Sequence, residues 1–415
     1  MKVCVVGSGG REHALALHLA RTAQVVVAPG NAGMEWTSIG GSPLEITDMP
    51  PEAVDADLWV IGPEQPLVDG LADKLRADDR LVFGPGADGA RLEGSKAFMK
   101  EVLDEAGVAT ARYGAFDEVR PAHDFLRELP GPWVVKTDGL ASGKGVLVTD
   151  DRSEAEADIV AKLSGEAFGP AGRRVVVEEG LVGAECSLMV LCDGTRIAAW
   201  PVAQDYKRLG DGDVGPNTGG MGSCSGPGLL ADAVVDRILD ESVEPVVAAL
   251  RRRGIDYRGA LYAGLILTAD GPKVLEYNVR FGDPETQVVV PRLNEDITGL
   301  LAEAASGRLR TDPHPAPTAA VCVVLASRGY PADPRPGDPV EGLETMAFHR
   351  DVTVFHAATA RDDQGRLVTN GGRVLGVTGT GPTMAEARDH AYAAVDGISW
   401  DGMQYRTDIA GDRSP

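Results

Sequence analysis

The chain has 415 residues, of which 43% are hydrophobic and 25% are charged, and its formal net charge is −22. This length predicts roughly two to four domains with sizeable cores. The acidic excess argues against a nucleic-acid-binding protein, because such proteins need a basic face to neutralise phosphates.

The five cysteines form no C-x-x-C pair, which is typical of free thiols in a reducing compartment. No apolar stretch reaches the length of a membrane span, and the apolar run after Met1 is too short for a secretion signal. The sequence therefore predicts a soluble, cytoplasmic protein without membrane contact.

Residues 1–95 alternate short apolar segments with helical ones, a pattern that predicts an open parallel α/β domain. Strands are predicted at residues 3–6, 25–28, 58–61 and 81–83, with a helix at 12–20. Each strand ends in Gly or Pro beside a polar residue. Because ligands bind at the carboxyl edge of such sheets, this edge is a candidate site.

The middle of the chain changes character, and the next helix is predicted at residues 97–106. Predicted strands follow at 133–136, 146–149, 175–178, 186–192 and 196–202. Residues 205–228 are predicted to be a long glycine-rich loop, and loops of this length are usually functional, with disorder as the alternative. Helices are predicted at 231–252 and 296–305.

A proline-rich segment at residues 311–317 is the best linker candidate. Beyond it, strands are predicted at 319–326, 352–357 and 373–378, with a helix at 384–398. This order indicates a small C-terminal α+β domain. The tail at 411–415 is expected to be disordered.

Two apolar runs, residues 261–268 and 273–279, flank a turn and predict a β-hairpin. Alternation along the second run would send Leu275, Tyr277 and Val279 into a core. Glu276, Asn278 and Arg280 would share the opposite face. A carboxylate and an amide oxygen on one face suit a divalent ion that carries phosphates.

The glycine loops narrow the choice of nucleotide site. The loop at residues 7–10 fails the dinucleotide fingerprint, because Glu12 replaces the third glycine and the expected acid after the second strand is missing. With Arg11 it is either a phosphate site or a plain strand-to-helix turn. The loop at 136–145 is not a P-loop, but Lys136 and Lys144 are placed as in a flap over nucleotide phosphates.

Taken together, the chain resembles the phosphoribosylamine–glycine ligase family of the ATP-grasp superfamily over nearly its whole length. The resemblance rests on an ordered set of motifs: GGREH (9–13), PGNAG (29–33), GPEQPLV (62–68), EGSK (93–96), KTDGLASGKG (136–145), GPNTGGMG (215–222), RFGDPE (280–285), NGGRVL (370–375) and YRTDI (405–409). Tyr206 departs from the family, in which histidine is expected.

The resemblance implies an α/β protein with three domains: an N-terminal open parallel α/β domain at 1–95, a two-lobed α+β ATP-grasp domain at 96–312 with a flap at about 114–185, and a small C-terminal α+β domain at 313–410. It implies ligation of glycine to 5-phosphoribosylamine in de novo purine biosynthesis. ATP would be converted to ADP and phosphate through a glycyl phosphate, with Mg²⁺ or Mn²⁺ as the metal.

The resemblance also implies roles for individual residues. ATP phosphates would contact Lys96 and Lys136, and Lys144 would lie in the flap. The backbone of Glu178, Glu179 and Leu181 would hold adenine, and Glu185 the ribose. Glu276 and Asn278 would bind the metal, and Arg280 and Asp283 would orient the reacting groups. The phosphoribosylamine would lie near Gly9, Gly10, Arg11, Asn31, Glu64, Asp205, Lys207, Asn217, Thr218 and Gly219.

Three other interpretations stay open at this point. Another ATP-grasp ligase, biotin carboxylase-like or formate-using, would share the nucleotide site. A nicotinamide-dependent oxidoreductase would rest on the first glycine loop alone. A non-catalytic nucleotide-binding protein would be expected to have lost the metal ligands. The expected partners are small molecules only, with the protein a monomer or a weak dimer.

Overall fold

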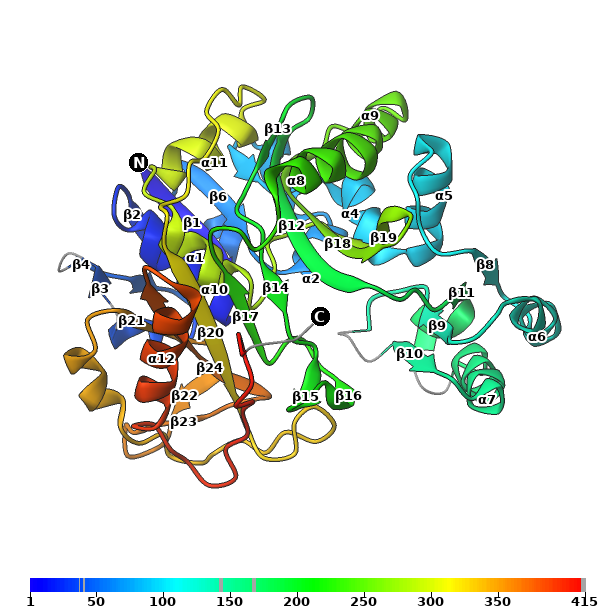
Figure 1. Cartoon of the computed structure of the whole chain (residues 1–415). Coiled ribbons are helices and arrows are strands. Elements are labelled where there is room, and N and C mark those ends of the chain that lie inside the picture. The colour runs from blue at the N-terminus through cyan, green and yellow to red at the C-terminus, as the bar shows by residue number, and fades with distance from the viewer. Residues whose placement is uncertain (37, 40–41, 142–144, 166–168, 412–415) are drawn as a thin grey trace.

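The computed structural model describes residues 1–36, 38–39, 42–141, 145–165 and 169–411 (Figure 1). The N-terminal part is an open, fully parallel sheet in the order β5-β2-β1-β6-β7, as predicted. Its strands are β1 (Lys2–Gly7), β2 (Gln24–Pro29), β5 (Glu45–Ile46), β6 (Leu58–Ile61) and β7 (Val82–Phe83). Its helices are α1 (Gly10–Leu19), α2 (Glu64–Val68), α3 (Leu71–Ala77) and α4 (Ala87–Gly94), and β3 (Ser38–Ile39) pairs with β4 (Ser42–Pro43).

A small lobe projects from the body of the molecule, at the right of Figure 1. It is an antiparallel sheet in the order β10-β9-β11-β8 with two helices. Its elements are β8 (Tyr113–Phe116), α6 (Val119–Glu128), β9 (Trp133–Thr137), β10 (Val146–Thr149), α7 (Arg152–Leu163) and β11 (Val175–Glu179). Val135, Val177, Leu126 and Ile159 belong to its own apolar core. We call this unit the flap lobe.

The body contains a second antiparallel sheet, in the order β13-β12-β18-β19. Its strands are β12 (Ala184–Asp193), β13 (Ile197–Ala199), β18 (Arg258–Thr268) and β19 (Gly271–Asn278), and the helices of this part are α5 (Lys96–Ala106), α8 (Asp232–Ile238), α9 (Glu244–Arg252) and α11 (Ile297–Ala305). The helical segment predicted at 231–252 is confirmed, with a π-helical turn at Leu239–Val243 between α8 and α9. Pro245, the second residue of α9, lacks a backbone N–H and interrupts the regular hydrogen bonds at this point.

The C-terminal sheet has the order β14-β17-β20-β24-β21. Its strands are β14 (Gln204–Asp205), β17 (Gly222–Ser225), β20 (Ala319–Ala326), β21 (Val352–His356) and β24 (Arg373–Gly381); α12 (Met384–Val395) packs on β20 and β24, and β22 (Thr359–Arg361) pairs with β23 (Leu367–Thr369). β14 and β17 come before residue 312 and the other three strands come after it. The sheet is therefore built from both sides of the predicted domain boundary.

The prediction of an irregular loop at residues 205–228 is wrong for much of its length. Besides β17, the segment contains the hairpin of β15 (Arg208–Gly210) and β16 (Val214–Asn217). These strands are short and polar, so they carry no apolar alternation that a sequence pattern could show. The predicted tail at 411–415 lies, except for Gly411, outside the described residues.

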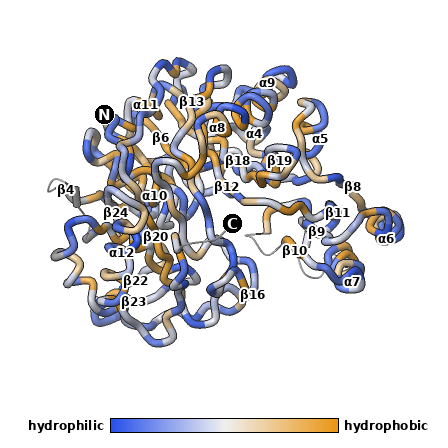
Figure 2. Tube along the Cα trace, viewed as in Figure 1, coloured by the Kyte–Doolittle hydropathy of each residue, from blue (hydrophilic) through white to orange (hydrophobic). Residues whose placement is uncertain are grey.

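The N-terminal sheet and the body share their apolar cores. Val5 and Leu15 lie in the same buried cluster as Met189 and Val288. Figure 2 shows this apolar interior on the central strands, while α6 and α7 of the flap lobe carry many hydrophilic residues. The flap lobe has a core of its own, whereas the N-terminal sheet and the body share two large apolar clusters.

Two further features concern the function classes considered above. Among the described residues, none of the helices combines the length and the apolar character needed to cross a bilayer. Cys4, Cys186, Cys192 and Cys322 are buried, and burial raises the pKa of each thiol to about 12. These four thiols are therefore poor nucleophiles at neutral pH.

Candidate active site

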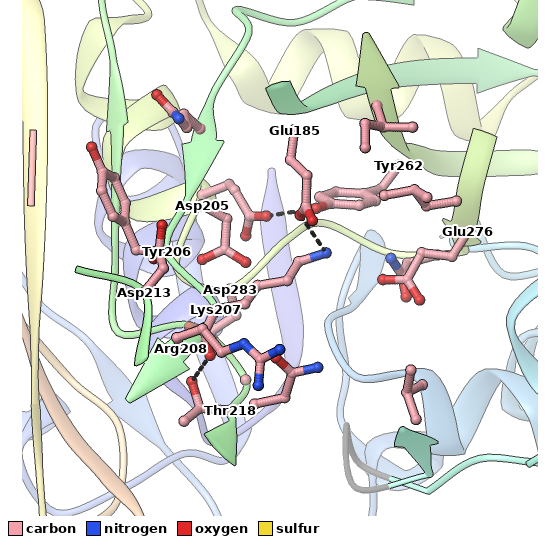
Figure 3. Close-up of a pocket in the computed structure, with 18 of the residues that line it drawn as sticks. Glu185, Asp205, Tyr206, Lys207, Arg208, Asp213, Thr218, Tyr262, Glu276 and Asp283 are labelled. Carbon is pink, nitrogen blue, oxygen red and sulfur yellow. Dashed lines mark hydrogen bonds and ion pairs between the residues drawn. The ribbon is translucent and has the colours of Figure 1, made fainter. Parts of the chain in front are cut away.

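A cleft of about 1850 Å³ lies between the flap lobe and the body, and side chains from all three predicted domains line it. One wall is formed by β9, β10 and the end of β11. The opposite wall combines the start of α5, strand β19 and the segment at 204–219, with C-terminal residues at its rim. Figure 3 shows the part of this cleft around Lys207 and Glu276.

Glu276 lies in a positively charged part of the cleft. Lys96 Nζ, at the first residue of α5, is 3.8 Å from Glu276 Oε2. Burial raises the pKa of the Glu276 carboxyl, but Lys207, Lys96 and further cations lower it to about 2. Asn278 Oδ1 faces the same cleft and accepts a hydrogen bond from Arg280 Nη2 at 3.3 Å. The hairpin therefore presents an ionised carboxylate and an amide oxygen side by side.

A β-bulge in this hairpin changes one predicted orientation. Gly264 pairs with Glu276 and Leu265 pairs with Val274, which leaves Leu275 as an extra residue. The prediction that Leu275 points into the core is wrong, because Val274 is buried and Leu275 lines the cleft. The bulge thus places two consecutive residues on the cleft side.

A buried chain of charges joins α5, the flap lobe and β19. Glu178 accepts ion pairs from Lys136 Nζ and Lys100 Nζ, each at 3.1 Å. Lys136 Nζ also donates to the carbonyl oxygen of Leu275 at 3.1 Å, and Lys100 Nζ donates to Thr110 Oγ1 at 2.7 Å. We call Lys100, Glu178 and Lys136 the buried triad. It fixes the ammonium group of Lys136 at the cleft wall.

The charge states within the buried triad follow from burial and proximity. Burial lowers the pKa of Lys100 to about 8, although Glu178 opposes this shift. Burial raises the pKa of Glu178, but the charges of Lys136 and Lys100 outweigh it and lower that pKa overall. Glu178 is therefore ionised, and its side chain serves as the anchor of two lysines.

Arg280 is held by acids from the N-terminal part of the chain. Its Nη2 donates to Glu93 Oε1 at 2.9 Å, and its Nε donates to Glu64 Oε2 at 3.3 Å. Glu93 Oε2 in turn accepts the backbone N–H of Val279 at 2.8 Å. Glu93 had no predicted role, and Glu64 was predicted to contact a substrate. The structure shows that both fix the guanidinium at the cleft floor.

Lys207 reaches the cleft from the segment after β14 (Figure 3). Its Nζ lies 3.5 Å from Glu185 Oε2, and its carbonyl oxygen accepts Thr218 Oγ1 at 2.8 Å. Burial lowers the pKa of Lys207, but nearby carboxylates, led by Glu185, raise it above its ordinary value. Lys207 is therefore a permanent cation. Asn217 lines the cleft nearby.

The C-terminal domain contributes an arginine that had no predicted role. Arg373 Nη1 donates to the backbone oxygens of Asp283, at 2.7 Å, and of Gly219. It also lies 3.5 Å from Asp283 Oδ1, and the backbone N–H of Arg11 donates to Asp283 Oδ2 at 3.4 Å. Burial raises the pKa of Asp283, but Arg373 and Arg11 lower it overall. Asp283 is therefore ionised where the three parts of the chain meet.

Arg406 holds the β15–β16 hairpin against the C-terminal domain. Its Nη1 donates to Asp213 Oδ1 at 2.6 Å and to the carbonyl oxygen of Arg208 at 3.2 Å. Its Nε and Nη2 donate to Asp408 at 2.7 and 2.6 Å. Asp408 Oδ2 also accepts the backbone N–H of Gly212 at 2.8 Å. The C-terminal YRTDI motif thus positions the hairpin that borders the cleft.

The predicted adenine and ribose residues lie together at the hinge of the flap lobe. Glu178, Glu179, Leu181 and Glu185 all line the cleft. The Glu179 side chain is already engaged, since its Oε1 accepts the backbone N–H of Arg112 at 2.9 Å. Lys144, the predicted flap lysine, lies outside the described residues.

Some predicted substrate residues are not in the lining of this cleft. Gly10 is buried beside Gln287, and Gly9 donates its backbone N–H to Glu12 Oε2 at 2.6 Å. The carboxylate of Glu12 therefore occupies the N-terminus of α1, where the sequence suggested a phosphate site. Asn31 lines a separate cavity of about 670 Å³ beside the C-terminal domain, and its amide donates to the carbonyl oxygen of His356 at 3.1 Å.

The donors in the cleft fit a hard divalent cation. Among the described residues, no group of three or more His, Cys, Asp or Glu side chains is placed to hold a metal. Glu276 and Asn278 instead supply two oxygen ligands. Mg²⁺ typically binds one or two carboxylates together with substrate phosphates, so a two-oxygen protein site beside Lys96 and Lys136 suits a metal–triphosphate complex.

Three family models match consecutive parts of the chain. The N domain of phosphoribosylglycinamide synthetase matches residues 1–93, its ATP-grasp (A) domain residues 94–286, and its C domain residues 320–412. The chain belongs to the phosphoribosylglycinamide synthetase family. Phosphoribosylamine–glycine ligase of Caulobacter vibrioides is 47% identical over 99% of this chain and 97% of its own length, and that of Escherichia coli O157:H7 is 45% identical over 99% and 98%.

Solved structures agree with this family assignment. The crystal structure of phosphoribosylamine–glycine ligase from Thermotoga maritima is 36% identical, with a TM-score of 0.86 over 98% of this chain and all of its own length. A biotin carboxylase domain from Hydrogenobacter thermophilus, solved with ADP and magnesium, has a TM-score of 0.70 at 19% identity over 97% of this chain and 91% of its own length. The second likeness shows the shared ATP-grasp fold alone.

The one departure from the synthetase family noted above has a structural role. Tyr206 is buried, its hydroxyl accepts the backbone N–H of Ala410 at 2.9 Å, and the guanidinium carbon of Arg406 lies 5.1 Å from its ring centre. This tyrosine links the segment after β14 to the C-terminal end of the described chain.

Sequence reasoning missed several residues of the site. Glu93 and Arg373, and Glu285, which also lines the cleft, stand inside three of the family motifs, so motif membership was the available signal. Lys100 and Tyr262, the second of which also lines the cleft, carried no signal, because a lysine within a helix and a tyrosine within an apolar strand are ordinary. Their partners lie far away in the sequence.

Proposed function

We propose that this protein joins glycine to 5-phosphoribosylamine, the ligation for which its relatives are named, with conversion of ATP to ADP and phosphate. The observation that supports this most is the meeting in one cleft of Glu276 and Asn278 with Lys96 and Lys136. Oxygen ligands beside ammonium groups are what a metal-bound triphosphate requires, since catalysis of phosphoryl transfer is mostly positioning and neutralisation of charge.

ATP would enter with its triphosphate between Lys96 and Lys136 and its base at the hinge of the flap lobe. The backbone of Glu179 and Leu181 would pair with adenine, and Glu185 would accept hydrogen bonds from the ribose. The buried triad supports this placement, because it fixes the ammonium group of Lys136 before ATP arrives. Lys144 would cover the phosphates from the flap.

Glu276 and Asn278 would hold Mg²⁺ or Mn²⁺. The metal would supply neutralisation of charge on the phosphate oxygens. The pKa of about 2 for Glu276 supports this role, because the carboxylate stays ionised throughout the physiological range.

The chemistry would proceed in two transfers. A carboxylate oxygen of glycine attacks the γ-phosphorus, the bond to the β-phosphate oxygen breaks, and ADP leaves with that electron pair. The amine of phosphoribosylamine then attacks the glycyl carbonyl carbon, inorganic phosphate leaves, and the amine loses a proton. Arg280 and Asp283 would orient the reacting groups, and no covalent enzyme intermediate is required.

The phosphoribosylamine would lie toward the N-terminal domain, beside Arg11 and Glu64 and under the segment that carries Lys207, Asn217 and Thr218. Support comes from the position of these residues around the cleft. Asp205 and Gly219 border the same region. Gly9, Gly10 and Asn31, outside the lining of the cleft, are the weakest members of the predicted set.

The test is release of ADP in the presence of ATP, Mg²⁺, glycine and freshly made phosphoribosylamine, with each component omitted in turn. We expect ADP to depend on all four components, and Mn²⁺ to replace Mg²⁺. ADP release that depends on bicarbonate or formate, but not on glycine, would contradict the proposal.

The cytoplasmic location and the monomeric or weakly dimeric state are further proposals. The location rests on the cysteine content and composition of the chain. Light scattering on a gel-filtration column measures the second directly, and fractionation of cells measures the first.

A further inference from the structure

Two acidic side chains meet in an enclosed corner of the cleft, next to Lys207. Asp205 ends β14, and Glu285 immediately precedes α10 (Thr286–Val289). Both line the cleft, and the Glu285 residue is only 3% exposed. Figure 3 shows Asp205 and Tyr262 on the same side of the cleft as Lys207.

Neutral hydroxyl groups hold Glu285 in place. Tyr262 Oη, on β18, donates to Glu285 Oε1 at 2.8 Å, and Ser187 Oγ, on β12, lies 2.7 Å from the same tyrosine oxygen. Within the described part of the chain, no lysine or arginine forms an ion pair with Glu285 or Asp205. The corner is therefore built around carboxylates whose charge no protein cation contacts directly.

The carboxylate of Asp205 has an unsatisfied oxygen atom. Its Oδ1 is inaccessible to solvent and has no hydrogen-bond partner. Burial, together with the negative charge of Glu285, raises the pKa of Asp205 well above its ordinary range. A buried acceptor without a donor is costly unless a ligand supplies the donor. A group with several N–H donors and a positive charge would satisfy both carboxylates.

The surroundings restrict what that group is. Gly220 has a φ of +107°, and a Cβ there would lie 2.8 Å from Asp205 Oδ1 and 2.5 Å from Pro284 Cδ. The turn therefore lies directly against the Asp205 carboxylate, and a side chain at residue 220 would fill the space beside it. Lys207 and Arg280 also line the cleft, and their positive charges attract an anion. A negative corner beside positive groups is complementary to a small zwitterion.

Of the three substrates in the proposed function, on which this inference rests, only glycine is a zwitterion with a lasting ammonium group. ATP and phosphoribosylamine bring phosphates, which the acidic corner repels, and the attacking amine must be unprotonated. We propose that Asp205 and Glu285 bind the ammonium group of glycine, with Tyr262 and Ser187 as positioning residues for Glu285. The glycine carboxylate then extends toward Arg280 and Lys207.

Glu285→Gln tests this assignment, because the amide oxygen can still accept from Tyr262 while the charge is lost. We expect the KM for glycine to rise by about 10- to 100-fold, the range of a lost charged hydrogen bond. The KM for ATP should change by less than about twofold. Glu241→Gln is the control: this carboxylate pairs with Arg237 outside the lining of the cleft, so its loss should leave the KM for glycine unchanged.

Glycolate, which has a hydroxyl in place of the ammonium group, is used as a competitive inhibitor against glycine. It distinguishes loss of ammonium binding from a general distortion of the glycine site. Its inhibition constant against glycine should be nearly equal in the wild type and in Glu285→Gln. Equal weakening of glycine and glycolate, or a fall in kcat with an unchanged KM for glycine, would overturn the inference. The second of these results would indicate a proton acceptor for the amine instead.

Two further variants cover the case in which Glu285→Gln does not fold. Asp205→Asn should show the same pattern, and Tyr262→Phe should show a smaller rise in the KM for glycine because only the support of Glu285 is lost. An unchanged KM for glycine in both folded variants would also overturn the inference. Failure of the wild-type protein to release ADP in response to glycine would count against the proposed function, so the two failures are distinguishable.

Discussion

Replacement of Glu178 by glutamine should damage the protein far more than the same change at the next residue. Glu178 is 1% exposed and joins Lys100 and Lys136, whose ammonium nitrogens each lie 3.1 Å from one of its oxygens. In Glu178→Gln both ammonium groups stay in the same enclosed space without a counter-charge. Glu179→Gln is the control, because an amide oxygen there can still accept the backbone N–H of Arg112.

The size of the effect follows from burial. Removing one partner of a buried ion pair typically costs about 3–5 kcal/mol, because the remaining charge is desolvated and uncompensated. We therefore expect the free energy of unfolding of Glu178→Gln to fall by about 3–5 kcal/mol. The control should lose less than about 1 kcal/mol, since it keeps its hydrogen bond at a half-exposed site.

The assay is urea denaturation followed by circular dichroism, with KM for ATP measured on the same preparations. Adding Lys100→Met to Glu178→Gln should recover part of the stability, because the uncompensated ammonium group of Lys100 is removed. The KM for ATP should stay raised in the double variant, since Lys136 still lacks its anchor. Equal stability of Glu178→Gln and Glu179→Gln would refute the reasoning.

Three more predictions concern the metal, the pH dependence and the hairpin. Glu276→Gln should lower kcat for ADP formation by at least about 100-fold while the denaturation midpoint is kept; normal turnover would contradict the metal assignment. Burial lowers the pKa of His356 to about 4, so between pH 6.5 and 4 the unfolded state binds a proton that the native state does not. Stability should therefore fall by about 3 kcal/mol through this one group as the pH falls through the window. Burial also lowers the pKa of His13 and of His18, so His356→Asn should reduce the acid slope by about one proton while His314→Asn leaves it unchanged; an undiminished slope in His356→Asn would contradict this prediction. Arg406→Gln should lower the free energy of unfolding by about 2 kcal/mol, because a buried guanidinium loses its hydrogen bonds to two partly exposed carboxylates and a carbonyl oxygen. The exposed Arg366→Gln should lose less than about 1 kcal/mol; similar losses in the two variants would show that the hairpin contacts are weak.

Local patterns in the sequence were sufficient for most of the regular elements. The parallel sheet of residues 1–95 and the β18–β19 hairpin follow from short apolar runs that end in turn residues, and these runs are as evident in the sequence as in the structure. The ordered motifs identified the family. The side-by-side placement of Glu276 and Asn278 was predictable, because both stand on one strand and alternation fixes their faces.

The β-bulge at Leu275 could not be predicted from apolar alternation. Alternation predicts the face of a residue only while the pairing register is unbroken, and a single extra residue reverses every position before it. The break depends on how β18 and β19 pack against the rest of the body. Nothing in the residues from Lys273 to Glu276 marks it. An interior position was therefore assigned to a residue that faces the cleft.

The partners within the site were unpredictable for a related reason. Arg280 and Glu93 are 187 residues apart, and Arg373 and Gly219 are 154 apart, so no local pattern connects them. The β15–β16 hairpin shows the consequence most clearly. Its strands are short and polar, and their own sequence gives no reason for them to pair. They are ordered because Arg406 and Asp408, almost 200 residues later, supply the charges that fix Asp213, Arg208 and Gly212. The border of the cleft is therefore set by the far end of the chain, which explains why a motif distant from the chemistry belongs to the same functional unit.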